Sequence, residues 1–72
     1  MEYLVVIEKA ENNYSAYLPD LPGCVATGET PEEVVSAIKK AVQMHLQGMQ
    51  EDGLTAPRPS ARADYLQIEQ AV

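Results

Sequence analysis

The chain has 72 residues, with eleven acidic and five basic side chains and a formal net charge of -6. This length allows one small domain over residues 1–72 and leaves no room for a separate substrate or regulatory domain. Nucleic acid is not expected as a partner because binding to phosphates depends on basic side chains, whereas acidity serves solubility or a basic partner. A domain this small buries only about 60% of its unfolded surface, which favours shielding by a second copy.

Cysteine content and hydropathy indicate the compartment. Cys24 is the only cysteine, so no internal disulfide and no thiolate-rich metal site are expected, and a reducing setting is favoured. The N-terminus lacks the pattern of a signal peptide, and no apolar run approaches the length of a membrane span. The sequence therefore predicts a soluble, unprocessed, cytoplasmic protein that does not interact with a membrane.

Three strand patterns occupy the first part of the chain. Residues Tyr3–Glu8 form a continuous apolar, β-branched run, which is typical of a central strand buried on both faces. The polar segment Ala10–Asn13 predicts a hairpin into a second strand at Tyr14–Leu18. The Pro-rich turn Pro19–Gly23 then leads to a short third strand at Cys24–Gly28. A three-stranded antiparallel meander is the simplest arrangement.

A helix is predicted to follow the third strand. Thr30 has the character of an N-cap, Pro31 suits the first helical position, and Glu33 completes a capping box. Apolar residues recur at spacings of three and four from Val34 to Met49, so one helix face is expected to pack on the sheet. Gly53 is the expected C-terminal cap.

A fourth strand is expected from about Asp64 to Glu69, after a segment with the Pro-containing composition of a surface linker. A strand, a helix and a further strand in this order predict a right-handed crossover that places the last strand parallel to a neighbour. The predicted fold class is therefore α+β, with the element order β-β-β-α-β. Alternation puts Tyr65 and Gln67 on one face of this strand and Leu66 and Ile68 on the other.

Candidates for catalysis are weak. Cys24 opens a strand after a glycine, whereas an activated thiolate needs a helix N-terminus or a cationic neighbour, so a packing role is favoured. His45 is the only histidine and lies on the apolar helix face, where a structural role is again favoured. No two carboxylates have metal-site spacing, and no Gly-rich loop with a lysine is present to hold a phosphate. Neither enzyme activity nor a metal or cofactor is expected.

The Pro-rich turn and one sheet face are the candidate binding features. Asp20 lies between two prolines, where its carboxylate either caps a local backbone group or meets a basic side chain of a partner. A sheet with a single helix has one uncovered face, and the first strand is apolar on both faces. These features predict self-association, a bound partner protein, or both. The candidate partner-binding residues are Tyr17, Pro19, Asp20, Leu21 and Pro22.

Two sequence runs resemble those of a known family. Tyr-Leu-Pro-Asp-Leu-Pro-Gly-Cys at residues 17–24 and Thr-Gly-Glu-Thr-Pro-Glu-Glu at residues 27–33, with Ala37 and Ala41, resemble the HicB-like antitoxins of prokaryotic toxin-antitoxin pairs. The resemblance spans nearly the whole chain. It implies a partial ribonuclease H-like fold of three antiparallel strands, a helix and a fourth strand. It also implies that the protein binds and neutralises HicA, a small basic toxin that cleaves messenger RNA, by covering its active surface.

The charge of the chain agrees with this implied role. Opposite charge speeds the encounter with a basic toxin, and an occupied toxin surface excludes RNA. The carboxylates do not form the metal cluster that a ribonuclease H reaction needs, so no nuclease activity is expected. Many such antitoxins carry a C-terminal DNA-binding segment, and the sequence ends at Val72 without one, so direct DNA binding is not expected.

The expected partners are therefore a HicA-like toxin and further copies of the chain, in a dimer or tetramer. The alternative is a solitary homo-oligomeric module that binds another protein or a small ligand and has no cognate toxin.

Overall fold

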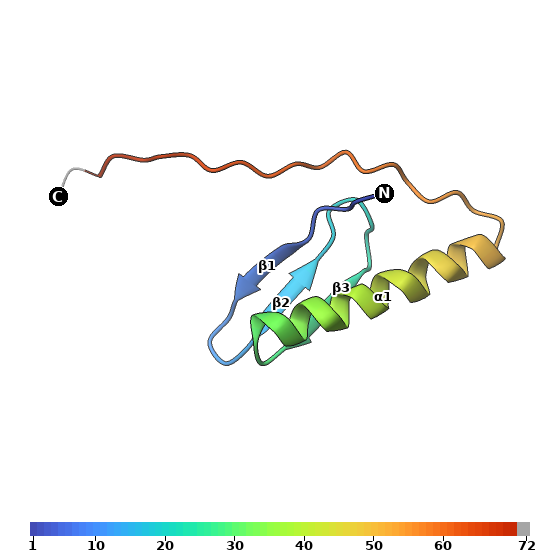
Figure 1. Ribbon diagram of the computed structural model, residues 1–72, viewed down its shortest axis with the longest axis horizontal. Coiled ribbons are helices and arrows are strands. Elements are labelled where there is room, and N and C mark those ends of the chain that lie inside the picture. Colours follow the sequence, from blue (N-terminus) through green and yellow to red (C-terminus); the bar gives the residue numbers. More distant parts are fainter. Residues whose placement is uncertain (71–72) are drawn as a thin grey trace.

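The computed structural model describes residues 1–70, which form a three-stranded antiparallel sheet with one helix across it (Figure 1). The strands are β1 (Val6–Lys9), β2 (Tyr14–Tyr17) and β3 (Val25–Gly28), and the helix α1 spans Pro31–Glu51. Sheet order follows chain order, β1-β2-β3. The predicted α+β class, the antiparallel meander and the following helix are confirmed.

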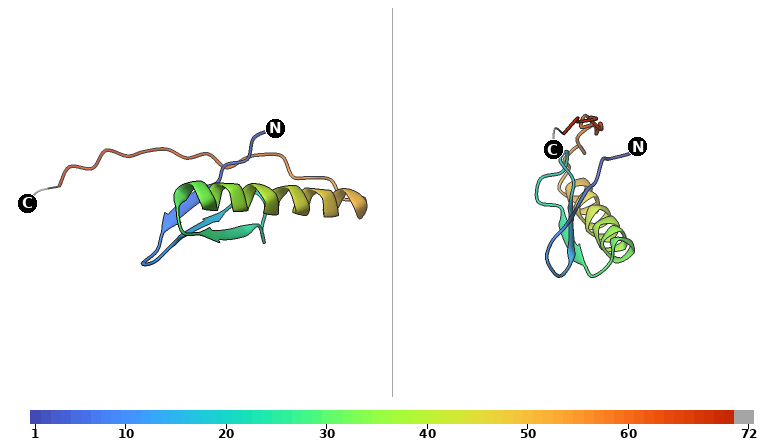
Figure 2. Two further views of the ribbon diagram at one scale, coloured as in Figure 1. Left: turned by 60° about the horizontal axis from the view of Figure 1, so that its bottom comes forward. Right: turned by 90° about the vertical axis from the view of Figure 1, so that its left-hand side faces the viewer.

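The sheet register decides which side chains face the helix. Ala16, in the middle strand, is buried beneath α1, so Ala16 and its cross-strand partners Ile7 and Ala26 lie on the covered face. Alternate residues point to the other side, because side chains of a strand alternate between its two faces. Figure 2 shows that α1 lies on one side of the sheet. We call the other side the open face; by register it comprises Val6, Glu8, Ser15, Tyr17, Val25 and Thr27.

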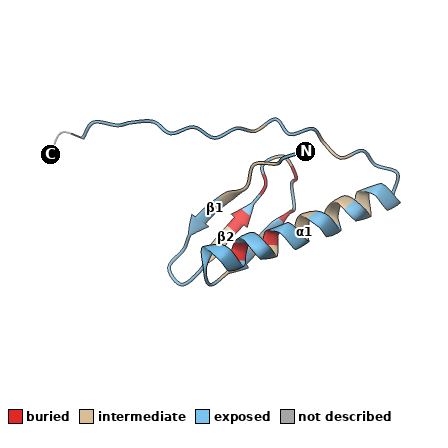
Figure 3. Ribbon diagram, viewed as in Figure 1, coloured by how far each residue is buried: buried red, intermediate tan, exposed pale blue. Residues whose placement is uncertain are grey.

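The core lies between α1, β2 and the turn that follows β2 (Figure 3). Helix and sheet lie very close together where α1 begins. A Cβ atom placed on Gly28 would lie 2.6 Å from the backbone nitrogen of Val34, so only glycine permits this approach. The core residues are Ala16, Leu18, Leu21, Cys24, Val34 and Ile38.

Both predicted caps of α1 are present. The hydroxyl oxygen of Thr30 accepts a hydrogen bond from the backbone N–H of Glu33 at 3.1 Å. The Glu33 carboxylate reaches back to the backbone N–H of Glu29 at 3.0 Å, one residue before the expected N-cap partner. At the other end Gly53 adopts a φ of 72°, and the N–H of Leu54 donates to the carbonyl of Met49 at 2.8 Å.

β1 is shorter and more exposed than the sequence indicates. It begins at Val6. If the pairing continued toward the N-terminus in the same register, Leu4 would lie opposite Pro19, which has no N–H to donate to a ladder. Within residues 1–70 it also lies at the sheet edge, where Ile7 is half-exposed. The expectation of a central strand buried on both faces is therefore wrong for this chain by itself.

The segment after the helix, which we call the arm (residues 54–70), is extended (Figure 1). The Tyr3 hydroxyl donates a hydrogen bond to the Pro57 carbonyl at 2.6 Å. The expected strand Asp64–Glu69 is extended but unpaired, because the arm runs beyond the sheet after Ala61. The fourth strand is thus not formed within residues 1–70, and the order found there is β-β-β-α.

Candidate partner-binding site

The five candidate residues around the Pro-rich turn take different positions. Leu21 is only 1% exposed and packs in the core, and the backbone N–H of Leu21 donates to the Leu18 carbonyl at 3.2 Å. The side chain of Leu21 therefore supports the turn from inside the molecule. Tyr17, Pro19 and Pro22 are exposed. The turn presents an apolar outer surface of one tyrosine and two prolines.

Asp20 is engaged within the chain. Its carboxylate accepts hydrogen bonds from the backbone N–H of Ser60 at 3.0 Å, from the Ser60 hydroxyl at 2.9 Å and from the N–H of Ala61 at 3.1 Å. These hydrogen bonds to the charged form, above all that from the Ser60 backbone, hold the pKa of Asp20 below its ordinary value. Asp20 therefore ties the Pro-rich turn to the arm, and it caps a distant backbone segment instead of a local one.

The open face is the second part of the site. Val25 is 67% exposed and Tyr17 is 40% exposed, and the register places them opposite each other on β3 and β2. A shallow depression of about 370 Å³ lies over these two strands. Glu8 is the one charged side chain of the open face within the described sheet, since Lys9 points to the covered side. Three of the six open-face residues, Val6, Tyr17 and Val25, are apolar or aromatic, and none of the six carries a positive charge.

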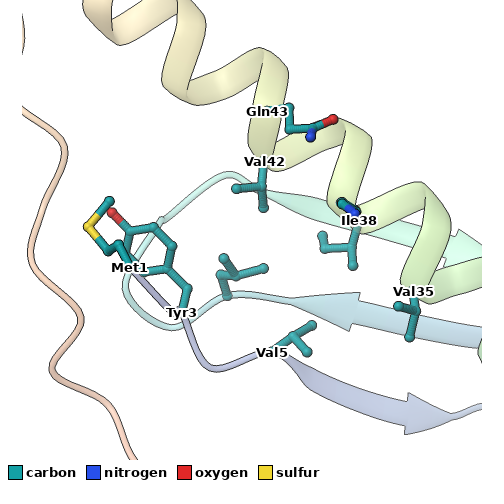
Figure 4. A pocket seen from close by; sticks show the side chains of 9 residues that line it. Met1, Tyr3, Val5, Val35, Ile38, Val42 and Gln43 are labelled. Carbon is teal, nitrogen blue, oxygen red and sulfur yellow. The ribbon is translucent and has the colours of Figure 1, made fainter.

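A separate apolar groove lies between α1 and the N-terminal segment that leads into β1 (Figure 4). It has a volume of about 370 Å³, and it exists because α1 packs mainly on β3 and β2 and leaves the helix side of β1 uncovered. Lys39 is the only charged residue among those that line it. The lining consists of Met1, Tyr3, Val5, Leu18, Val35, Ile38, Lys39, Val42 and Gln43.

The residues considered for catalysis lie outside these surfaces. Cys24 is buried, and desolvation raises the pKa of its thiol, which disfavours the nucleophilic thiolate. His45 is half-buried on the sheet-facing half of α1. Among residues 1–70 no group of three or more His, Cys, Asp or Glu side chains is arranged to hold a metal ion. Over the same residues, no helix combines the length and apolar character needed to span a bilayer.

The sequence indicated the turn but not the groove or the full open face. In the third strand Val25 and Thr27 share one face and Ala26 lies on the other. This period-two pattern, combined with the predicted meander, could have placed Val25 beside Tyr17. The groove had no comparable signal. It depends on which strands the helix covers, and residues of the N-terminus and of α1 meet there only in three dimensions.

The fold and the site define a small acidic α+β domain with an exposed Pro-rich turn and an open sheet face. A family model described as "HicB_like antitoxin of bacterial toxin-antitoxin system" matches residues 3–71. The match covers nearly the whole chain. The chain belongs to the HicB-like antitoxin family, as the sequence resemblance predicted.

Relatives among curated proteins come from phage, bacteria and archaea. The chain is 35% identical over 66 residues to the "Uncharacterized 14.9 kDa protein in rep-hol intergenic region" of Haemophilus phage HP1. The matched region covers 92% of this chain and 50% of the relative. It is 45% identical over 49 residues to a UPF0150 protein of Helicobacter pylori, and the matched region covers 68% of each of the two chains. A UPF0150 protein of Thermoplasma acidophilum is 34% identical over 62 residues, 85% of this chain and 90% of the relative.

This chain thus spans half the length of the phage relative. Comparison with solved structures gives no match.

Proposed function

We propose that this chain is an antitoxin that binds a small basic HicA-type toxin and covers the surface with which the toxin cleaves messenger RNA. Family membership over residues 3–71 is the observation that carries the proposal. The net charge of -6 supports it, because a basic RNA-binding surface attracts an acidic partner and the occupied surface is closed to RNA. The protein acts by occupying that surface in the cytoplasm, without chemistry of its own.

The proposed contact surface is the open face together with the outer side of the Pro-rich turn. Three strands of four residues cover only roughly 190 Å², taking the usual spacing between strands and rise per residue. A stable interface takes about 800 Å² from each partner, so it must extend beyond the sheet. Pro19 and Pro22 adjoin the sheet at the ends of β2 and β3, where Tyr17 and Val25 are exposed. Within this surface, Leu21 and Asp20 shape the turn and the other residues make the contact.

Co-expression with a HicA-type toxin, sought among small basic proteins encoded beside this gene, tests the proposal. The antitoxin should restore growth that the toxin arrests and should copurify with it. Val25→Lys should abolish both effects, because it puts a positive charge at the centre of the proposed contact. Met44→Lys is the matched control, since Met44 is also an exposed apolar residue but lies on α1. Equal behaviour of the two variants, with unchanged melting temperatures, would contradict the proposed surface.

A homo-oligomeric binding module without a toxin is the second candidate, and the groove between α1 and the N-terminal segment favours it. The groove is apolar and open, and its volume of about 370 Å³ lies at the lower end of the range for small-ligand pockets. A rise in melting temperature with a small apolar ligand, together with no binding to a HicA-type toxin, would support this candidate instead.

A further inference from the structure

The arm leaves its own domain after Ala61. Tyr65, Leu66 and Ile68 are 97%, 82% and 71% exposed, and no backbone hydrogen bond joins residues 62–70 to another segment of the described chain. The radius of gyration is 14.9 Å, whereas a compact chain of this length has one of about 11 Å. Figures 1 and 2 show the cause of this large radius, an extended arm that runs past the sheet. The domain thus leaves apolar side chains in water.

The base of the arm is held in place. Tyr3 binds the carbonyl of Pro57, and Asp20 binds the backbone of Ser60 and Ala61. From Ala61 to Glu69 an extended chain spans about 26 Å. The two anchors therefore aim a segment of strand length away from the domain, and this segment has the alternating pattern of a half-buried strand.

The domain also has a vacant place for a strand. Within residues 1–70 the outer edge of β1 is unpaired, and its backbone N–H and C=O groups are free to extend the sheet. The groove adjoins the start of β1, between α1 and the N-terminal segment that contains Tyr3 and Val5 (Figure 4). A strand added to this edge would place alternate side chains in the groove, against Val5 and Val35.

We propose that two copies of this chain exchange arms, so that residues 64–69 of each copy pair with the β1 edge of the other and put Leu66 and Ile68 into its groove. A second copy is the occupant because it supplies both an arm and a vacant edge. In a twofold exchange the same arm-to-edge contact occurs twice, so both vacant edges are filled. Charge also fits, since Asp64 and Glu69 flank the inserted side chains and Lys39 lines the groove. The exchange completes a four-stranded sheet in each half and is independent of the proposed toxin binding.

Light scattering on the full chain gives the first test. The expected mass is twice that of the 7.9 kDa chain at micromolar concentration. Ile68→Asp should raise the dimer dissociation constant at least roughly tenfold, because a buried apolar side chain becomes charged. Gln67→Asp adds the same charge at the next position on the opposite strand face and should leave the constant within about threefold. A monomeric wild-type chain, or equal effects of the two variants, would overturn the proposal.

These arm variants should not disturb folding of the domain, because Ile68 is 71% exposed and Gln67 is exposed. The receiving groove is tested by Val35→Asp, with Met44→Asp as the control outside the groove. Circular dichroism should show unchanged helix content in both. Val35→Asp should weaken the dimer as Ile68→Asp does, and a dimer that tolerates Val35→Asp would rule out this groove.

Cross-linking distinguishes exchange from folding of the arm onto its own domain. Two differently tagged copies are co-expressed, one with Ile68→Cys and the other with Ile7→Cys, and treated with a short bismaleimide. Cys24 is buried and should not react. A covalent dimer carrying both tags is expected. If the same reagent instead links both positions within a monomer of the double variant, or links neither pair, the exchange is wrong.

Discussion

The carboxylate of Asp20 accepts hydrogen bonds from both the backbone N–H and the hydroxyl of Ser60, at 3.0 and 2.9 Å, although the two residues are 40 positions apart. This pair joins the turn between β2 and β3 to the arm. A carboxylate that takes several donors at once fixes both distance and direction, since the acceptor geometry of its two oxygens is specific. Asp20 therefore sets the point from which the arm departs.

Asp20→Asn should release the base of the arm. The amide is neutral and has one acceptor oxygen, so it keeps only part of the contacts with Ser60 and Ala61. Trypsin cleavage after Arg62 should then become several-fold faster. Asp52→Asn is the matched control, because Asp52 is an exposed aspartate that ends α1 and lies outside the arm. Equal cleavage rates in the two variants would contradict an anchoring role for Asp20.

The same contact should depend on pH. The pKa of Asp20 is lowered from 3.8 by the backbone N–H of Ser60 and then by that of Ala61. A carboxyl group with a lowered folded-state pKa stabilises the folded contact fully above its unfolded-state value, and the contribution is lost as pH falls through the folded-state value. The arm should therefore be held fully above pH 3.8 and released as the pH falls through the folded-state pKa, which lies below 3.8. Amide exchange at Ser60 and Ala61 would report this release.

Asp20→Asn separates this effect from the titration of the other carboxylates. In that variant, exchange at Ser60 and Ala61 should already be fast at neutral pH and should change little on acidification. A wild-type-like pH profile in the variant would assign the release to another group.

Two glycines should respond in opposite ways to alanine. Gly28→Ala puts a Cβ atom 2.6 Å from the Val34 backbone nitrogen, and neither backbone can move without loss of core packing. We expect destabilisation by about 1 to 3 kcal/mol. Gly48→Ala, inside α1 with no atom within 4 Å of the added Cβ, should stabilise by about 0.5 to 1 kcal/mol. Thermal unfolding measures both, with about 4 to 8 °C expected per kcal/mol.

The turn residues should divide into structural and contact groups. Leu21→Ala removes a fully buried side chain and should cost about 2 to 5 kcal/mol of unfolding free energy. Tyr17→Ala and Pro22→Ala remove exposed side chains and should leave stability within about 1 kcal/mol. If the open face binds the toxin, the exposed pair should weaken copurification at unchanged melting temperature. Full toxin binding by both exposed variants would remove the turn from the proposed contact surface.

Much of the fold could be predicted because it depends on short-range chemistry. Thr30, Pro31 and Glu33 define the helix start through hydrogen bonds and a fixed φ within four residues. The hairpin between β1 and β2 and the turn at Gly23 likewise depend on neighbouring residues. Period-two and three-to-four patterns predicted the strands and the helix face for the same reason.

Part of the proposed contact surface was also within reach of the sequence. Tyr17, Pro19 and Pro22 are exposed at the turn on which the family resemblance was recognised. Asp20 was recognised as an unusual acceptor, but its donors could not be identified. Ser60 and Ala61 lie far along the chain, in a segment whose composition indicates only a linker.

By itself the sequence determined the element types, their caps and the acidic balance, because backbone preference and side-chain periodicity act over a few residues. Only the tertiary structure decided that β1 lies at an edge, that α1 leaves a groove beside it, and that the arm runs outward. These features depend on where distant segments meet in space. A strand pattern such as that of Asp64–Glu69 specifies that a segment suits a sheet. It does not specify which sheet edge the segment joins, or whether that edge belongs to the same chain or to another copy.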